Sequence, residues 1–221
     1  MSNNPFESPQ NPMSAKPAVQ PQSGPAKSAM PGAMMTIAII CIILAIFGLI
    51  GSCIGGLALA AQGAIEEFVD GIPQPPDQKE FNRMNMGAQG VMMVPGFIMI
   101  IINLFVATLL LVGSIGCLQR KAGGRNILNL ALLAAIFYSV LKIGVQIYNY
   151  FAVSGALNAA VADYTGEVPV ATLERMVQAN NIGLIVGAVL GVVFALAMMV
   201  FYIWAKFYVS KEQTIRFFEA Q

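Results

Sequence analysis

The residue best suited to chemistry in this sequence is a lysine inside a long apolar stretch. Lys142 is the only Lys, Arg, Asp or Glu well within such a stretch, and Gln146 and Asn149 follow it at i+4 and i+7. This spacing places the three side chains on one face of a helix. Because intramembrane charges usually face the protein interior and often mark a pathway or ligand site, Lys142 is the first candidate for binding or transport.

Two further polar residues lie at a similar depth to Lys142, and with it they form a candidate polar layer. Lys142 lies about 25 Å along a helix from Arg125, within reach of the outer interface, and Asn103 and Ser52 come out at a similar depth. Three interpretations stay open. The ammonium snorkels along its stem to headgroups or acidic loops, which we favour. Otherwise the residues form a structural hydrogen-bonded layer, or a transport or ligand site.

Other patterns for catalysis or metal binding are missing from the sequence. It contains no histidine, and no Asp or Glu lies within the apolar stretches, which removes the usual groups of proton-coupled transport. No nucleotide-binding, zinc-protease or serine-hydrolase motif is present. The cluster Met84, Met86, Met92 and Met93 suits Cu(I), but methionine also simply fills apolar space. We therefore expect no enzyme activity, no cofactor and no metal site.

Four long apolar stretches must position these residues. They cover residues 34–61, 91–118, 127–151 and 182–208. Each exceeds the ~20 residues that cross a ~30 Å hydrocarbon core. Only 10% of the residues are charged, against about 25% in soluble domains. The sequence predicts an all-α membrane protein with four transmembrane helices in a bundle, and its net charge of +1 gives no reason to expect nucleic-acid binding.

Two tails flank the transmembrane domain, which we place at residues 33–210. Residues 1–32 are rich in Pro, Ser and Gln and are predicted to be disordered, and residues 211–221 form a short tail. The opening Asn4-Pro5-Phe6-Glu7-Ser8-Pro9 resembles the Asn-Pro-Phe/Tyr-Glu-Ser-Pro openings of uncharacterised multi-pass bacterial membrane proteins. This resemblance covers about six residues and implies the bacterial cytoplasmic membrane, with no known activity.

Charges between the stretches predict the orientation. Basic residues gather in the leading tail, in residues 119–125 and after the fourth stretch, whereas residues 62–90 and 152–181 are rich in acid. The positive-inside rule then makes both termini cytoplasmic and both acidic loops external.

The loops hold short amphipathic segments, namely Ile65, Phe68 and Val69 in the first and Val170, Leu173, Met176 and Val177 in the second. We expect these to cap the bundle or lie on the membrane; a partner-binding outer face is the alternative.

Small residues at four-residue intervals predict helix packing. The fourth stretch contains Gly183, Gly187, Gly191 and Ala195, and the first contains Gly48, Ser52, Gly56 and Ala60. Such stripes let helix backbones approach closely in lipid. We expect both stripes at contacts within the bundle, with a dimer seam as the alternative.

The sequence as a whole favours a function without catalysis. The inner half of the stretches is nearly all apolar apart from Thr108, Ser114 and Asn129, so no polar track crosses it. We expect a membrane scaffold, accessory or interaction protein, whose partners are the lipid bilayer and other membrane proteins or a second copy. The alternative is a small transporter or channel subunit that uses the polar layer around Lys142.

Overall fold

The computed structural model describes residues 30–61, 64, 67–68 and 71–219. The opening motif, most of the predicted disordered tail, and Ile65 and Val69 lie outside the described residues. The described part of the chain is helical almost throughout and contains no strand, as the sequence predicts for an all-α protein.

In the described residues four helices are long and apolar enough to cross a membrane, the number that the sequence predicts. They are α1 (Gly32–Ala60), α4 (Met93–Leu118), α5 (Ala122–Ala162) and α6 (Val170–Val209). Two shorter helices accompany them: α3 (Pro76–Gly90) leads into α4, and α7 (Glu212–Glu219) follows α6. This composition is that of a multi-pass integral membrane protein.

Proline marks the start of three of these helices. Pro31, Pro75 and Pro169 occupy the N-cap positions of α1, α3 and α6, with φ between −53° and −58°. The pyrrolidine ring fixes φ near this value, and its missing N–H is harmless where the helix has no acceptor for it. Each of these prolines therefore favours the backbone conformation from which its helix begins.

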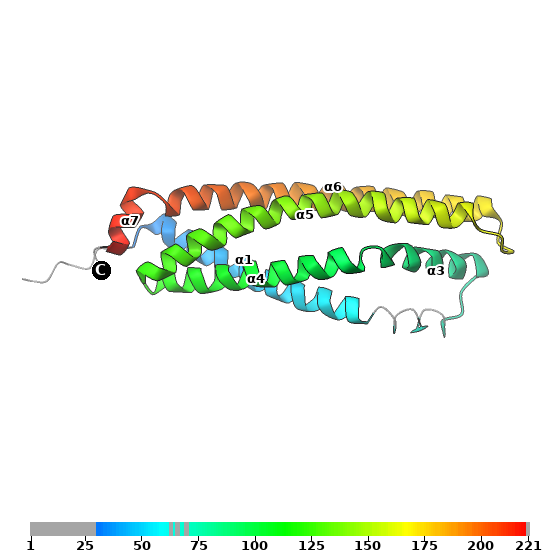
Figure 1. Cartoon of the computed structure of the whole chain (residues 1–221), viewed down its shortest axis with the longest axis horizontal. Coiled ribbons are helices and arrows are strands. Elements are labelled where there is room, and N and C mark those ends of the chain that lie inside the picture. The colour runs from blue at the N-terminus through cyan, green and yellow to red at the C-terminus, as the bar shows by residue number, and fades with distance from the viewer. Residues whose placement is uncertain (1–29, 62–63, 65–66, 69–70, 220–221) are drawn as a thin grey trace, which may run out of the picture.

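The long helices pack as successive antiparallel neighbours (Figure 1). The extensive contacts join α1 to α4, α4 to α5 and α5 to α6, whereas α1 touches α6 only sparsely. The start of α1, the α4–α5 turn and α7 lie at one end, called the α7 end; the α5–α6 loop and α3 lie at the other, called the α3 end. The α1–α6 seam is therefore the least closed side of the bundle.

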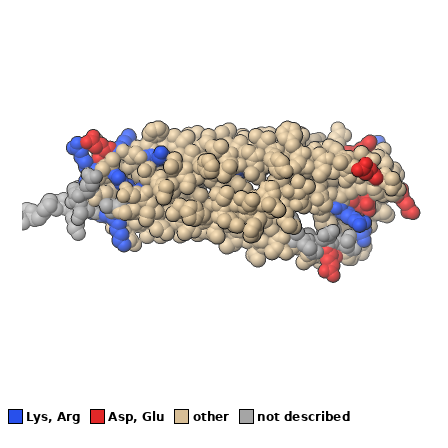
Figure 2. All heavy atoms as spheres, in the orientation of Figure 1, with Lys and Arg blue, Asp and Glu red and all other residues tan. Residues whose placement is uncertain are grey.

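Exposed side chains divide α6 into two sections. Near its start Glu174, Arg175 and Gln178 are exposed, but from Ile182 onward the exposed side chains are large and apolar, as lipid contact requires. Figure 2 shows the same division on the face in view, with charged residues at the two ends and an uncharged surface between them. The change on α6 falls between Gln178 and Ile182.

A first core fills the bundle at the α7 end. Met34, Ile37 and Cys41 of α1 are fully buried there against residues of α4, α5 and α6. Helix α7 contributes Phe217 and Phe218, both buried. The segment predicted as a short tail, residues 211–221, is thus a packed amphipathic helix over residues 212–219.

Helices α4 and α5 come closest at a glycine crossing formed by Gly113, Gly116 and Gly124. A Cβ on Gly116 would lie 2.7 Å from the Cα of Gly124, and one on Gly113 would lie 2.6 Å from the backbone nitrogen of Leu128. The chain enters this crossing through Arg120, whose φ of 59° is left-handed. The Arg120 N–H donates to the Cys117 carbonyl, which closes the end of α4 as such a residue commonly does.

Helices α5 and α6 extend well past the predicted spans. With 41 and 40 residues they are about 60 Å long, twice the hydrocarbon core. Beyond the lipid-facing section they continue as a hairpin that packs on α3, here called the helical extension. Its own core is the second cluster of buried residues in the described chain: Ala88, Val153, Leu157, Val161, Leu173 and Val177.

The sequence prediction placed acidic loops with short helical segments where this extension lies. The segment at Val170–Val177 is the beginning of α6, and its Leu173 and Val177 are buried against α5 rather than free at a membrane surface. The loop between the two helices spans only residues 163–169. The structure therefore makes the second predicted amphipathic segment part of the long helix α6.

Candidate functional site

Lys142 lines a cavity of about 270 Å³ between the four long helices. Helix α1 contributes Phe47 and Gly51, α4 contributes Asn103, and α6 contributes Phe194. Helix α5 adds two further polar side chains, Tyr138 and Ser139, next to Lys142, and Tyr202 lines the cavity from α6. The structure thus brings Lys142 and Asn103 together, as the count of helix turns predicts.

The ammonium of Lys142 lies over an aromatic ring and has no counter-ion among the described residues. Its Nζ lies 5.6 Å from the centroid of the Phe194 ring, a cation–π distance. Among the described residues no Asp or Glu forms an ion pair with Lys142; the ion pair on α7 joins Arg216 to Glu212. A lysine without a counter-ion in an apolar environment is costly, so this position calls for an explanation.

The exposed side chains of α5 give the depth of Lys142. Its lipid-facing section runs at least from Leu130, 57% exposed, to Phe151, 67% exposed, and the exposed residues of α5 beyond it are small or polar: Gly155, Asn158, Ala159 and Ala162. Lys142 therefore lies about 18 Å from one end of the section and about 14 Å from the other. That is farther than the four-carbon stem reaches, so the favoured interpretation of snorkelling does not fit this geometry.

Asn103 and Ser52 form a polar clamp between α4 and α1. The Asn103 side-chain amide donates to the Ser52 hydroxyl at 2.9 Å and to the Gly48 carbonyl at 3.0 Å. A Cβ on Gly48 would lie 3.2 Å from the Cβ of Ala107, so the two helices are close here. Gly48 and Ser52 are therefore at a helix contact, as the first stripe predicts.

The remaining members of the two small-residue stripes, on α1 and α6, differ in how closely they contact other helices. A Cβ on Gly191 would lie 3.1 Å from the Gln146 side chain, and Ala195 is buried beside the cavity. Gly56, Gly183 and Gly187 have nothing within 4 Å of an added Cβ, and Ala60 is exposed. These four positions are therefore outside the close contacts within the chain. Asn149, two turns from Lys142, does not line the cavity.

The cavity is closed toward the α7 end and open at the side. Ile37, Cys41, Ala45 and Leu110 of the first core lie on its α7 side and are buried and apolar. On the α1–α6 seam, by contrast, the cavity-lining side chains of Phe47 and Phe194 are 68% and 58% exposed. The geometry favours entry from the surrounding lipid over passage through the bundle.

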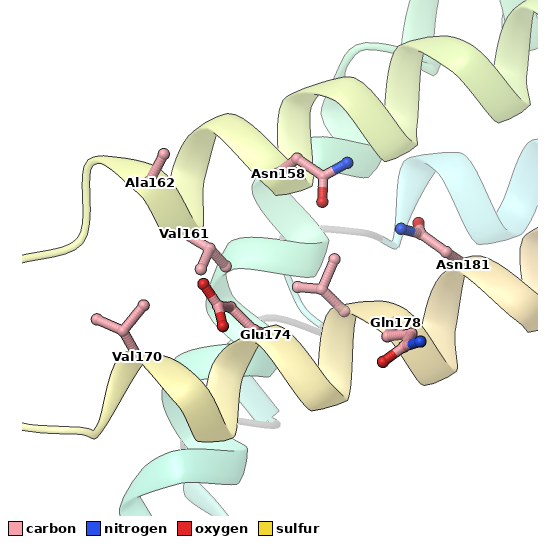
Figure 3. Close-up of a pocket in the computed structure, with 8 residues that line it drawn as sticks. Asn158, Val161, Ala162, Val170, Glu174, Gln178 and Asn181 are labelled. Atoms are coloured by element: carbon pink, nitrogen blue, oxygen red, sulfur yellow. The ribbon is translucent and has the colours of Figure 1, made fainter.

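A second hollow, of about 420 Å³, lies on the helical extension between α5 and α6. Asn158 and Asn181 face each other across it, and Glu174 reaches toward α5 (Figure 3). The side-chain oxygens of Asn181 and Asn85 and the Asn180 nitrogen are buried without a hydrogen-bond partner. Buried amides without partners are costly, so this region suits ordered water or a polar group from a partner.

Sequence reasoning missed Tyr138, Ser139 and Tyr202 in the cavity. Tyr138 and Ser139 precede Lys142 by four and three residues, so the helical face that carries Gln146 and Asn149 also runs in the other direction. This signal was available in the spacing. Tyr202 comes from another helix and required the fold.

Two of the four clustered methionines have a packing role, whereas Met93 is exposed. Met84 and Met92 pack against the core of the helical extension. The described residues contain no group of three or more His, Cys, Asp or Glu that could hold a metal ion.

Comparison with known proteins adds no identification. No model of a protein family matches the chain, and no curated protein or solved structure matches it either. The class of the protein therefore rests on its own four apolar helices.

Proposed function

We propose that this chain is a membrane scaffold or accessory protein that presents its helical extension to a partner outside the bilayer. The observation that carries the proposal is the hairpin of α5 and α6, which continues with its own buried core well past the lipid-facing section. A span needs only about 20 residues. The added length and its core are therefore best explained by a role beyond the membrane.

The closed first core supports this role over transport. A transporter needs a polar route across the bilayer, and the buried residues on the α7 side of the Lys142 cavity are mostly apolar, with Ser114 of α4 an exception. The small transporter or channel subunit remains the second candidate, because Lys142 has no acidic partner in the described chain. The proposal assigns no catalytic role to either site.

The proposed orientation puts both termini in the cytoplasm and the helical extension outside it. The support is the distribution of charge: Arg120, Lys121 and Arg125 lie in or beside the α4–α5 turn, whereas the α5–α6 loop carries Asp163 and Glu167. With the resemblance of its opening residues, this favours the bacterial cytoplasmic membrane. The open positions Gly183 and Gly187 keep a dimer seam among the proposed contacts with other membrane proteins or a second copy.

Site-specific photo-cross-linking in intact cells tests the proposal. A photoreactive residue replaces Gln178, exposed on the extension, or Ile185, which lies two turns further along the same face of α6 but in the lipid-facing section. We expect a discrete protein adduct from position 178, and lipid adducts or none from position 185. Absence of any protein adduct at 178, at Asn158 and at Ala171, all exposed on the extension, would contradict a partner-binding role.

Reconstituted vesicles separate the proposal from the transporter alternative. The purified chain should add no ion or solute flux to vesicles above that of empty vesicles. Robust flux that disappears in Lys142→Met, with unchanged folding, would replace the scaffold assignment by the transporter.

A further inference from the structure

We propose that the Lys142 cavity binds a long-chain carboxylate that enters from the bilayer through the α1–α6 seam. The carboxylate would lie beside the Lys142 ammonium, and its hydrocarbon chain would leave between Phe47 and Phe194. This binding site is independent of the scaffold role, because it lies within the membrane section and not on the helical extension.

Charge is the first argument for an anion. The four apolar stretches contain no Asp or Glu, and the nearest charged residue on α6, Lys206, is 12 residues beyond Phe194, about 18 Å. Lys142 is therefore a positive charge that the described chain does not neutralise. Pairing with an anion inside a low-dielectric cavity offsets much of this cost.

Two tyrosine hydroxyls that share the cavity with the ammonium also fit a carboxylate. Tyr138 and Tyr202 line the cavity. Within the described chain neither hydroxyl forms a hydrogen bond, so both are free to donate to a ligand. A carboxylate only accepts hydrogen bonds, and its two oxygens can take several donors at once. One ammonium and two hydroxyls form a suitable set of donors for it.

The depth of Lys142 and the size of the cavity favour a long-chain carboxylate over a phospholipid. Lys142 lies about 14 Å inside the nearer end of the lipid-facing section, so a bulky phospholipid headgroup would have to leave the interface to reach it. The cavity of about 270 Å³ is slightly smaller than a typical drug-sized pocket. It suits a small headgroup with the first part of one chain, while the rest of the chain lies in the seam.

The side opening explains how such a molecule gains access. Helices α1 and α6 touch only sparsely, and Phe47 and Phe194 on either side of the cavity are largely exposed. On α1, Gly51 also lines the cavity, and an added Cβ there would meet nothing within 4 Å. A side chain at this position would therefore fill the entrance without displacing the backbone.

Binding of palmitate to the purified full-length chain tests the proposal. Native mass spectrometry in detergent, with titrated palmitate, should show one bound molecule per chain. Lys142→Met should weaken binding at least about tenfold, as the loss of a charge-assisted hydrogen bond implies, whereas Lys206→Met, the same change near the end of α6, should not. Equal binding by the parent and Lys142→Met would overturn the proposal.

A second pair of variants keeps Lys142 in place. Gly51→Leu should reduce palmitate binding by blocking the entrance, and Gly56→Leu, on the same helix but outside the cavity, should leave it unchanged. Equal binding by these two variants would place the ligand elsewhere and overturn the proposed site. Thermal melts of all four variants establish that each is folded.

Other ligands identify which chemistry the cavity recognises. Methyl palmitate, which has no charge, should bind at least about tenfold more weakly than palmitate. If methyl palmitate binds equally well, the site recognises an apolar chain and not an anion. If phosphatidylglycerol binds in a Lys142-dependent manner and palmitate does not, the carboxylate is wrong and the site takes a phospholipid headgroup.

Discussion

The glycine crossing between α4 and α5 allows a sharp test of the packing. Gly123 and Gly124 are adjacent in the first turn of α5, but a Cβ at Gly123 meets nothing within 4 Å, whereas one at Gly124 would lie 2.6 Å from the Cα of Gly116. Alanine at either position brings the same gain in helix propensity. The two variants differ only in what the added methyl group meets.

The expected magnitude follows from this contact. The carbonyl carbon of Gly116 lies nearer still. Since carbon atoms pack at about 3.5–4.0 Å, Gly124→Ala must push α4 and α5 apart by about 1–2 Å. Since the neighbouring atoms are backbone, no side-chain rotation relieves the contact. Overpacking of this kind costs about 1–3 kcal/mol, whereas Gly123→Ala should be neutral or slightly stabilising.

Thermal unfolding in detergent, followed by a thiol-reactive dye, measures the difference. Cys41 and Cys117 are buried in the first core and report its opening, and Cys53, which is exposed, is replaced by serine in all variants. At about 2–4 °C per kcal/mol, Gly124→Ala should melt about 2–12 °C below Gly123→Ala. Identical melting of the two variants would refute the close crossing.

Three further predictions concern other parts of the molecule. Leu157→Ala, in the core of the helical extension, should cost about 2–5 kcal/mol locally and expose the extension to protease, whereas Leu190→Ala, on the exposed face of α6, should not. Gly187→Leu should leave the melting of the monomer unchanged, because its Cβ meets nothing; any loss of stability would reveal a dimer seam. Reporter fusions at Gly90 and Gly123 should give opposite signals, and an external signal at Gly123 would reverse the proposed orientation.

The four spans were predictable because lipid permits few structures. A run of 20 or more apolar residues must satisfy its backbone within one helix, so composition alone defines the span. The similar depth of Lys142 and Asn103, which line one cavity, was predictable by the same logic, since depth along a helix is proportional to residue number. Tyr202 could be added only once α5 and α6 were known to be neighbours.

The helical extension carried a signal that was not used. Val153, Leu157 and Val161 recur at i, i+4 and i+8, a helical stripe that continues α5 past Phe151. Falling hydropathy there indicates the end of the membrane and not the end of the helix. Phe217 and Phe218 were predicted to lie in a tail. Two aromatic residues in a polar segment do not by themselves predict a helix that packs on the bundle.

Helix faces were harder to predict than helices. Gly183, Gly187 and Gly191 share one face of α6, but only Gly191 meets a neighbouring side chain. In a membrane both protein and lipid are apolar, so the sequence contains little contrast to show which face turns inward. The closest approach instead involves Gly113, Gly116 and Gly124, which come together only when α4 turns back into α5.

The helical extension beyond the bilayer is the central claim, and spin-label accessibility along α5 in reconstituted bilayers tests it most directly. Single labels replace exposed residues, namely Phe137 and Ile147 in the lipid-facing section and Asn158 and Ala162 beyond it. We predict access to oxygen but not to a water-soluble nickel reagent at the first two positions, and the reverse at the last two. Lipid-like accessibility at Asn158 and Ala162 would contradict an extension outside the membrane.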